Sequence, residues 1–522
     1  MKNSALSFLF ETAVRFPERV CISDERGSLT FGAFMWRAFI ISQKLATSQD
    51  RNEPILIFLP KGTDAVVAFA AALMSGNFYV PVDIKAPDSR LAKIIINLSP
   101  SVVITQSQFR QRVIDLTGSS CEIIVVDEVS PAADTMGNVN EVVAACERPL
   151  DAIIDTDPCY VMYTSGSTGD PKGVVVSHRG VIDYIDWAVD CLSVDEKEIL
   201  GNQAPLFFDN STLDIYLSWA TGAHLLLIPE KLFMFPVQLI EYLERRCISF
   251  VFFVPSVLSA VSKLKALSEH SLPALRKIVF AGEVMPAKHL AYWQRLLPDR
   301  QYVNLYGPTE ITVDCTYYFL DRIFNPEESI PIGYPCRNSA ILVLNERDQA
   351  ASIGEQGELC VRGSSLALGY WNDPQKSASV FCQNPLQKHY FDRIYRTGDL
   401  VYRDEEDRII FVGRKDSQIK LHGYRIELGE IERAAETLPF VQRAVAVFVP
   451  TREELHLYYE GNEAIKPHIV IKGLAELIPH YMVPRVIQHV AQFPINENGK
   501  IDRKTLLESS AARANRRGSD VG

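Results

Sequence analysis

The sequence predicts a large α/β body of helix-covered, mainly parallel sheets, followed by a small α+β domain. Three observations lead to this fold class. The chain has 522 residues, more than a single hydrophobic core usually serves. Short apolar runs alternate with helix-like segments over most of its length. Charged residues then crowd together after residue 400, ahead of a compact C-terminal unit that is long enough for a small domain.

Short apolar runs mark the expected strands of the large body. Residues 54–59 read PILIFL, and an apolar helix-like segment follows at residues 65–74. Further apolar runs with turn residues around them lie at residues 101–105, 123–126, 250–254 and 277–280. Buried parallel strands joined by crossover helices produce this pattern. We therefore expect sheets that are covered by helices on both faces.

A change of composition marks the expected domain boundary. Residues 403–408 read RDEEDR and residues 413–416 read GRKD, after which residues 427–438 have helical character. We place a hinge at Asp416, which divides the chain into a large body, residues 1–415, and a small domain, residues 416–522. The alternative is a charged surface hairpin, and charge alone does not decide between the two.

Composition narrows the class of protein. Apolar residues make up 47% and charged residues 22% of the chain, as in ordinary soluble globular proteins. The net charge of −11 argues against binding to nucleic acid. No apolar run approaches the roughly 18 residues of a membrane span, and the N-terminus lacks a signal-peptide pattern. Ten scattered cysteines suggest free thiols in a reducing compartment, so we expect a cytoplasmic protein without membrane insertion.

The most informative stretch is residues 163–173, which read YTSGSTGDPKG directly after a short apolar run. Glycine lets backbone N–H groups turn toward a phosphate, and hydroxyl and lysine side chains add donors and positive charge. The lysine spacing differs from that of the Walker loop. The alternative is a flexible surface loop. The sequence predicts a polyphosphate site made by Thr164, Ser165, Gly166, Ser167, Thr168, Gly169 and Lys172.

Three later segments carry further polar residues on predicted turns. Residues 304–310 (NLYGPTE) end on Glu310, whose carboxylate suits Mg2+ beside a nucleotide. Residues 395–400 (YRTGDL) place Asp399 where its carboxylate can accept two ribose hydroxyls, and Arg414 can bind phosphate or ribose oxygens. Residues 498–503 (NGKIDR) put Lys500 on a turn. Singly each segment is most often only a turn, but their joint occurrence in this order is a specific signal.

In this order the segments resemble the adenylate-forming (ANL) superfamily. The resemblance is to amino-acid adenylation domains of nonribosomal peptide synthesis and covers residues 1–507. It also rests on residues 73–83 (LMSGNFYVPVD), 357–363 (GELCVRG) with Gly369 and Tyr370, 413–432 and 478–484. Residues 208–216 (FDNSTLDIY) also look like the stand-alone D-alanine–carrier protein ligases. The resemblance implies an adenylate-forming enzyme fold, in which residues 1–415 form the adenylation core and residues 416–522 a mobile lid domain that rotates about the hinge.

The resemblance also implies a reaction and the residues that perform it. A carboxylate would react with ATP to give an acyl-adenylate and pyrophosphate, with Lys500 as the catalytic residue. Thr309 would bind the α-phosphate, Glu310 the Mg2+, and Asp399 with Arg414 the ribose. The phosphate loop would hold the β- and γ-phosphates. Five residues would line the adenine: Gly282, Glu283, Asn304, Leu305 and Tyr306. Gly307 and Pro308 complete the implied ATP-binding set.

The implied acyl substrate is a small or medium amino acid: glycine, alanine, serine or a short diamino acid. The pocket positions carried over are Asp209, Asn210, Leu213, Ser256, Val279, Ala281, Leu305, Val313, Asp314 and Lys500. Asp209 would pair with the substrate's α-ammonium, because a buried carboxylate is costly without a cation. It could instead cap the following helix. Asp314 could accept a substrate hydroxyl or second ammonium, or it could face water.

These residues favour an amino acid:carrier protein ligase that depends on ATP and Mg2+. The chain ends soon after Arg503 without a phosphopantetheine attachment motif, so we expect transfer to a separate carrier protein or to coenzyme A, with the carrier protein as the leading choice. Two alternatives remain: an acyl- or aryl-CoA synthetase, and a non-catalytic protein with the same fold. The sequence leaves open the exact amino acid, the carrier, and whether the pathway modifies the cell envelope or makes a natural product.

Overall fold

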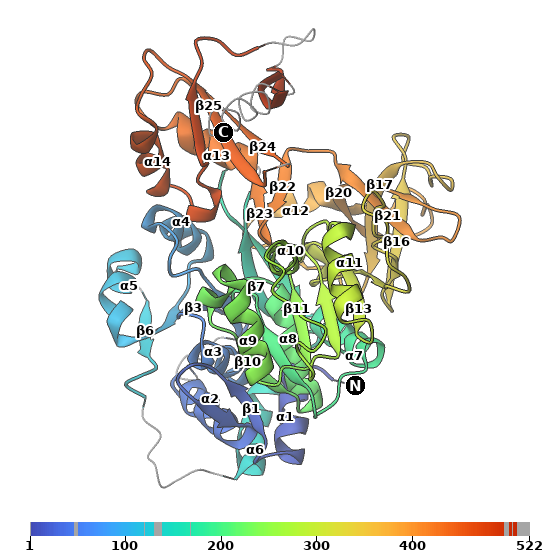
Figure 1. Cartoon of the computed structure of the whole chain (residues 1–522). Coiled ribbons are helices and arrows are strands. Elements are labelled where there is room, and N and C mark those ends of the chain that lie inside the picture. The colour runs from blue at the N-terminus through green and yellow to red at the C-terminus, as the bar shows by residue number, and fades with distance from the viewer. Residues whose placement is uncertain are drawn as a thin grey trace. The chain divides into compact units, whose positions relative to one another are not determined.

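The computed structural model describes residues 2–45, 51–118, 121–129, 138–166, 169–450, 452–494, 501–503 and 505–508. The chain forms two compact units, and Figure 1 shows the course of the chain through both. The first unit comprises Met1–Ile84, Asn97–Tyr163 and Gly173–Lys415. The second comprises Lys85–Ile96, Thr164–Lys172 and Asp416–Gly522. The roles assigned to the two domains, and the hinge at Asp416, stay predictions.

The largest sheet of the first unit has nine strands in the order β15-β14-β13-β12-β11-β9-β10-β1-β2. Its central strands β13, β12, β11, β9, β10 and β1 are parallel, and antiparallel strands lie at both edges. The strands are β1 (Val20–Ser23), β2 (Ser28–Thr30), β9 (Ile199–Asn202), β10 (His224–Leu227), β11 (Phe250–Phe253), β12 (Lys277–Phe280), β13 (Gln301–Tyr306), β14 (Thr316–Phe319) and β15 (Tyr334–Pro335).

A second sheet has seven strands in the order β18-β8-β7-β4-β3-β5-β6. Strands β7, β4, β3, β5 and β6 are parallel, and β18 runs antiparallel to β8. They are β3 (Pro54–Phe58), β4 (Phe78–Pro81), β5 (Val102–Thr105), β6 (Glu122–Val125), β7 (Pro158–Thr164), β8 (Lys172–Ser177) and β18 (Gly369–Tyr370). The apolar runs predicted as strands form β3, β5, β6, β11 and β12, which confirms those predictions.

Helices bury both faces of the nine-stranded sheet, as the sequence predicts (Figure 1). Successive residues of β11 show the alternation. Phe250 and Phe252 belong to the larger core, together with residues of both sheets, whereas Val251 and Phe253 belong to a second core. The larger core takes in α1 (Leu6–Arg15), α2 (Phe31–Leu45), α3 (Thr63–Met74), α7 (His178–Leu192) and α8 (Asn210–Thr221). The second core takes in α9 (Pro236–Arg245), α10 (Pro255–Lys263) and α11 (Ala287–Leu296).

An antiparallel sheet, which the sequence analysis did not predict, completes the first unit. Its strands are β16 (Ser339–Leu344), β17 (Gly357–Gly363), β19 (Phe381–Gln383), β20 (Arg393–Arg403) and β21 (Ile409–Arg414). The charged residues 404–408 form the turn between β20 and β21. The hairpin alternative is therefore right for this stretch, and the division between the units lies after β21, at Lys415. The other helices of the first unit are α5 (Arg110–Thr117), α6 (Val139–Leu150) and α12 (Pro374–Val380), whereas most of α4 (Asp88–Leu98) belongs to the second unit.

The C-terminal part of the second unit has an α+β architecture. A hairpin of β22 (Gln418–Leu421) and β23 (Tyr424–Glu427) leads into α13 (Leu428–Glu436), the helix that the sequence predicts. His422 and Gly423 both have positive φ, as a tight two-residue hairpin turn requires. A three-stranded sheet and α14 (Pro467–Ala475) follow, and together they bury a separate core. Its strands are β24 (Arg443–Val449), β25 (Glu454–Glu460) and β26 (Val486–His489).

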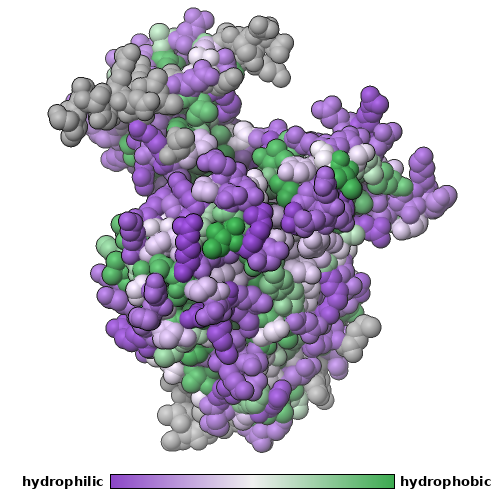
Figure 2. All heavy atoms as spheres, turned by 45° about the vertical axis from the view of Figure 1, so that its right-hand side comes forward, coloured by the Kyte–Doolittle hydropathy of each residue, from purple (hydrophilic) through white to green (hydrophobic). Residues whose placement is uncertain are grey.

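The surface is polar with scattered apolar residues. On the face drawn in Figure 2, hydrophilic residues surround small separate groups of hydrophobic ones. Over the residues that the structure describes, we find no helix with the length and apolar character needed to cross a membrane.

Candidate functional site

The antiparallel sheet of the first unit brings Asp399 and Arg414 together. The two residues are opposite one another in the β20–β21 pairing, and Arg414 Nη1 donates to Asp399 Oδ1 at 2.6 Å. The hydroxyl of Tyr306, at the end of β13, donates to Asp399 Oδ2. Burial and the charge of Asp399 raise the pKa of Tyr306 well above its usual value, so the phenol stays neutral and donates. Two donors thus fix the orientation of a buried carboxylate whose remaining lone pairs can accept further hydrogen bonds.

Thr309 and Glu310 lie one turn beyond β13, in a short 3-10 helix, Thr309–Ile311. Both residues are buried, Glu310 completely. The hydroxyl of Tyr370, in β18, donates to Glu310 Oε1 at 2.8 Å. The backbone carbonyl of Glu310 accepts from the N–H of Ala367 at 2.9 Å. This segment is therefore held both through its side chain and through its main chain.

The carboxylate oxygens of Glu310 are suitable ligands for a Mg2+ ion that is bound to a nucleotide. Mg2+ in nucleotide sites is usually held by one or two carboxylates together with phosphate oxygens and water. Within the described ranges, no group of three or more His, Cys, Asp or Glu residues could hold a metal on its own. A single buried carboxylate therefore fits one coordination position of a phosphate-bound ion, and not an all-protein cage.

Asp209 immediately precedes α8. Its backbone is helical, with φ −62° and ψ −28°, and its side chain makes no capping hydrogen bond to the helix. Since an N-cap residue normally has an extended backbone and accepts from a following N–H, the capping interpretation is wrong. Asp209 is half-buried, and its pairing with a substrate ammonium stays a prediction.

The apolar pocket positions lie together in the larger core of the first unit. Each is at most 2% exposed: Leu213, Val279, Ala281, Leu305 and Val313. They come from α8, β12 and β13 and from the segments that follow β12 and β13. Residues predicted from separate parts of the sequence are thus buried in one cluster. Asn210 lies close to Gly282, because a Cβ added to Gly282 would be 3.9 Å from Nδ2 of Asn210.

Asp314 does not face water. Only 3% of its surface is exposed, and the hydroxyl of Tyr184, on α7, donates to its Oδ2 at 2.6 Å. Burial, followed by the charge of Asp314, raises the pKa of Tyr184 well above its usual value, so this phenol also remains a neutral donor. The alternative in which Asp314 points to solvent is wrong.

Gly307 allows a close approach of two backbone segments at this site. A Cβ at Gly307 would lie 2.2 Å from the carbonyl oxygen of Val313 and 2.5 Å from Cα of Asp314. Thr312 and Val313 have φ of 58° and 71°, a conformation that is rare and strained for β-branched residues. The turn that follows Pro308 is therefore fixed tightly against Gly307, which sets the position of Asp314.

Two polar residues assigned to adenine have partners within the first unit. Glu283 Oε2 accepts from the N–H of Ser256 at 3.0 Å, at the first turn of α10. Asn304 is buried, and its Nδ2 donates to the carbonyl of Pro331 at 2.8 Å. Their side chains thus stabilise the local fold, and their contacts with adenine stay predictions.

The phosphate loop belongs to the second unit. Strand β7 ends at Thr164 and β8 begins at Lys172. The hydroxyl of Ser165 donates to the carbonyl of Arg425 at 2.8 Å. Thr164 Oγ1 is buried and has no hydrogen-bond partner among the described residues, which is costly unless a ligand supplies one. Gly166 and Gly169 are described, Gly169 with φ 87°, whereas Ser167, Thr168 and Lys500 lie outside the described residues.

The sequence analysis did not predict that tyrosines hold the buried carboxylates, and it missed a polar network that includes Asp214 of α8. Lys61 Nζ donates to the carbonyls of Asn202 and Gln203 at 3.2 and 2.9 Å, and Asn202 Nδ2 donates to Asp214 Oδ2 at 2.8 Å. Burial lowers the pKa of Lys61 to about 7 and raises that of Asp214 to about 7. No local pattern indicates these partners, because they come from distant parts of the chain.

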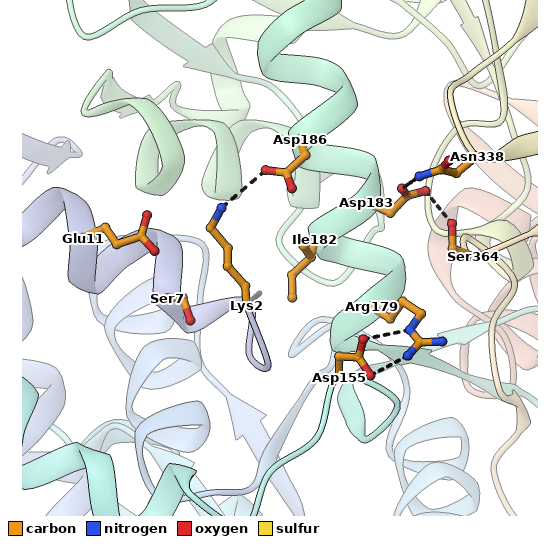
Figure 3. Close-up of a pocket in the computed structure, with 10 residues that line it drawn as sticks. All are labelled: Lys2, Ser7, Glu11, Asp155, Arg179, Ile182, Asp183, Asp186, Asn338 and Ser364. Carbon is orange, nitrogen blue, oxygen red and sulfur yellow. Dashed lines mark hydrogen bonds and ion pairs between the residues drawn. The ribbon is translucent and has the colours of Figure 1, made fainter.

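A polar hollow of about 720 Å³ lies on another part of the first unit (Figure 3). None of the predicted site residues lines it. The charged side chains drawn there are largely paired with one another, for example Arg179 with Asp155 at 2.8 Å and Lys2 with Asp186 at 3.6 Å. The lining residues are Lys2, Ser7, Glu11, Asp155, Arg179, Ile182, Asp183, Asp186, Asn338 and Ser364.

Comparison with known sequences identifies similar proteins over most of the chain. The family model "AMP-binding enzyme" matches residues 9–371. The chain is 31% identical to zwittermicin A synthase ZmaJ of Bacillus cereus, over 97% of this chain and 95% of that protein. It is 30% identical to D-alanine--D-alanyl carrier protein ligase of Bacillus cytotoxicus, over 92% and 96%. It is also 31% identical to tyrocidine synthase 1 of Brevibacillus parabrevis, over 95% of this chain but only 44% of that protein.

Solved structures show the same fold. The adenylation domain AlmE of Vibrio cholerae, in complex with glycyl-adenosine-5'-phosphate, aligns with a TM-score of 0.86 over 98% of both chains, at 23% identity. The artificially fused NpsA-ThdA of Klebsiella oxytoca aligns with a TM-score of 0.79 over 94% of both chains, at 21% identity. These likenesses confirm the predicted adenylate-forming fold.

The close approach at Gly307 gives a testable expectation. Gly307→Ala would place a Cβ against the backbone of Val313 and Asp314, so we expect a loss of about 2–4 kcal/mol in stability from strain and overpacking. Gly413→Ala is the matched control, because a Cβ there meets nothing within 4 Å. The measurement is the unfolding transition in urea. Equal stability of the two variants would contradict the tight packing described here.

Proposed function

Because the chain belongs to the AMP-binding enzyme family, we propose that it activates a small amino acid as an aminoacyl-adenylate with release of pyrophosphate. In a second step it transfers the aminoacyl group to the phosphopantetheine thiol of a separate carrier protein. The observation that carries this proposal is the match over 96% of a D-alanine--D-alanyl carrier protein ligase at 30% identity. In that alignment the chain is matched to a whole ligase, and not to one part of a multidomain synthase.

The first step needs a carboxylate to approach a phosphorus that is surrounded by negative oxygens. The amino acid's carboxylate oxygen attacks the α-phosphorus, and the bond from that phosphorus to the pyrophosphate oxygen breaks. Positioned donors and positive charge lower the barrier. In this proposal Thr309 donates to the α-phosphate and Lys500 bridges this phosphate and the attacking carboxylate.

The remaining groups of ATP are assigned to residues whose surroundings suit them. Asp399, oriented by Arg414 and Tyr306, accepts the two ribose hydroxyls. Thr164, whose buried hydroxyl lacks a partner among the described residues, and Lys172 bind the β- and γ-phosphates. Glu310 would hold Mg2+, which supplies positive charge to the phosphates when bound.

Asp209 selects amino acids in this proposal. Its half-buried carboxylate, which makes no capping hydrogen bond to α8, pairs with the α-ammonium of the substrate. An aryl or fatty acid offers no ammonium to this carboxylate, which disfavours those substrates. In the second step the carrier's thiol attacks the acyl carbon, and AMP leaves.

ATP–pyrophosphate exchange tests the proposed activity. With a panel of glycine, D- and L-alanine, serine, short diamino acids and aryl acids, we expect exchange that depends on a small amino acid. Exchange only with aryl or fatty acids would contradict the role of Asp209 and favour an acyl- or aryl-CoA synthetase. Absence of exchange with every acid, with and without a carrier protein, would favour a non-catalytic protein.

Replacement of Lys500 tests the assignment of the catalytic residue. Lys500→Ala removes a charge that acts on the developing negative charge in the transition state. We therefore expect exchange to fall about 100- to 1,000-fold while the affinity for ATP changes little. Lys472→Ala, at an exposed lysine of α14, is the control. Normal exchange by the Lys500 variant would show that another group is catalytic.

A further inference from the structure

Residues 367–371 hold Glu310 at two points. The N–H of Ala367 donates to the backbone carbonyl of Glu310 at 2.9 Å. Three residues further on, the hydroxyl of Tyr370 donates to Glu310 Oε1 at 2.8 Å. The sequence analysis assigned no role to Tyr370. Because the segment contacts both the main chain and the side chain of Glu310, it fixes where this residue lies and which way its carboxylate points.

The same segment is also bound to strand β8. Tyr370 is opposite Val174 in the antiparallel pairing of β18 with β8. The N–H groups of Leu368 and Trp371 donate to carbonyls of β8 at 2.8 and 2.7 Å. Strand β8 begins at Lys172, the lysine of the predicted phosphate loop. One segment thus joins the carboxylate proposed for Mg2+ to the strand that follows the phosphate loop.

The ring of Tyr370 is held in place by its surroundings. Only 5% of the residue is exposed, and its ring packs edge-on against that of Phe381 at 6.0 Å. Its backbone N–H donates to Ser377 Oγ, on α12, at 2.8 Å. The packing of the ring and the hydrogen bond of the main chain therefore set the position from which the hydroxyl reaches Glu310.

We propose that Tyr370 is a positioning residue for the metal ligand. Its hydroxyl sets the orientation of the Glu310 carboxylate, and through it the strength with which Mg2+ holds ATP on the enzyme. This inference rests on the proposed function, in which Glu310 holds the Mg2+. Tyr370 acts through Glu310, so it is assigned no contact with the ion or with the nucleotide.

The physical basis is that one hydrogen bond orients a carboxylate without using it up. A carboxylate offers about four lone pairs, of which a phenol uses one. Mg2+ requires near-ideal octahedral geometry with ligands at about 2.0–2.1 Å, so its binding is sensitive to rotation of a ligating carboxylate. Groups that hydrogen-bond to a metal ligand typically change metal affinity about 10- to 100-fold. The alternative is a hydrogen bond that serves stability alone.

Calorimetric titration of the full chain with ATP, at saturating Mg2+ and in EDTA, tests this inference. For the wild type we expect Mg2+ to strengthen ATP binding. For Tyr370→Phe, which keeps the ring and removes the hydroxyl, we expect ATP affinity at saturating Mg2+ to fall at least about tenfold. In EDTA the variant should bind ATP like the wild type.

Tyr318→Phe is the matched control. Tyr318 is a buried tyrosine that donates to Asp321 at 3.0 Å outside the predicted site. Its replacement removes the same kind of hydrogen bond, and it should leave ATP affinity unchanged at saturating Mg2+ and in EDTA.

The outcomes separate this inference from the proposed function. A Tyr370→Phe variant that unfolds like the wild type and keeps wild-type ATP affinity at saturating Mg2+ overturns the inference alone. An equal loss of affinity with and without Mg2+ also overturns it, because the tyrosine would then act on the whole nucleotide site. If Tyr370→Phe does not fold, Glu310→Gln decides: an unchanged effect of Mg2+ would mean that Glu310 holds no ion for Tyr370 to position. Absence of exchange with every amino acid overturns the proposed function, whereas the titrations still decide the role of Tyr370.

Discussion

Hydrogen bonds from tyrosine to buried carboxylates are the interaction on which the site of the first unit depends. A carboxylate removed from water is costly unless donors replace the lost hydration. In each of three cases a phenol supplies one donor without adding a charge. The pairs are Tyr306 with Asp399, Tyr370 with Glu310 and Tyr184 with Asp314.

A phenol suits a site that must bind a cation or a hydroxyl. An arginine or lysine partner would neutralise the carboxylate and leave it little attraction for a ligand. A tyrosine hydroxyl orients the carboxylate but leaves its charge in place. The hydrogen bond from Tyr370 thus leaves the charge of Glu310 in place for the Mg2+ that we propose. Asp399 differs, because Arg414 also pairs with it, and this matches its proposed neutral ligand, the ribose hydroxyls.

The fold brings these pairs together from distant parts of the chain. Tyr306 ends β13, and Glu310 and Asp314 follow within the next turns, so three of the predicted site residues lie at the carboxyl end of one strand. The carboxyl ends of parallel strands are where α/β proteins generally bind ligands. Asp399 comes from the antiparallel sheet, Tyr370 from β18 and Tyr184 from α7.

The sequence predicts the parallel strands because the pattern that marks each of them lies within the strand itself. The buried strands β3, β5, β6, β11 and β12 are continuous apolar runs, and this pattern needs no knowledge of their neighbours. The antiparallel sheet of residues 339–414 was not predicted. Its strand β20 alternates buried and half-buried residues and contains a glycine and several charges, which is a weaker signal.

Prediction of the site residues is likewise limited to what local sequence patterns show. Asp399, Glu310 and Asp314 could be proposed from motifs and resemblance, but their partners could not. Those partners are 93, 60 and 130 residues away in sequence, and no local pattern marks them. Only the structure decided between two pairs of alternatives. Asp209 makes no capping hydrogen bond to α8, and Asp314 accepts a hydrogen bond from a phenol rather than facing water.

The affinity for ATP of an Asp399→Asn variant, measured by calorimetry, tests the central claim most directly. Asparagine keeps the shape of the side chain but loses its charge and one acceptor. We predict that ATP binds at least about tenfold more weakly, whereas Asp392→Asn, at a buried carboxylate of the same unit that pairs with Arg362, leaves the affinity unchanged. Wild-type affinity in the Asp399 variant would contradict the assignment of this buried carboxylate to the nucleotide.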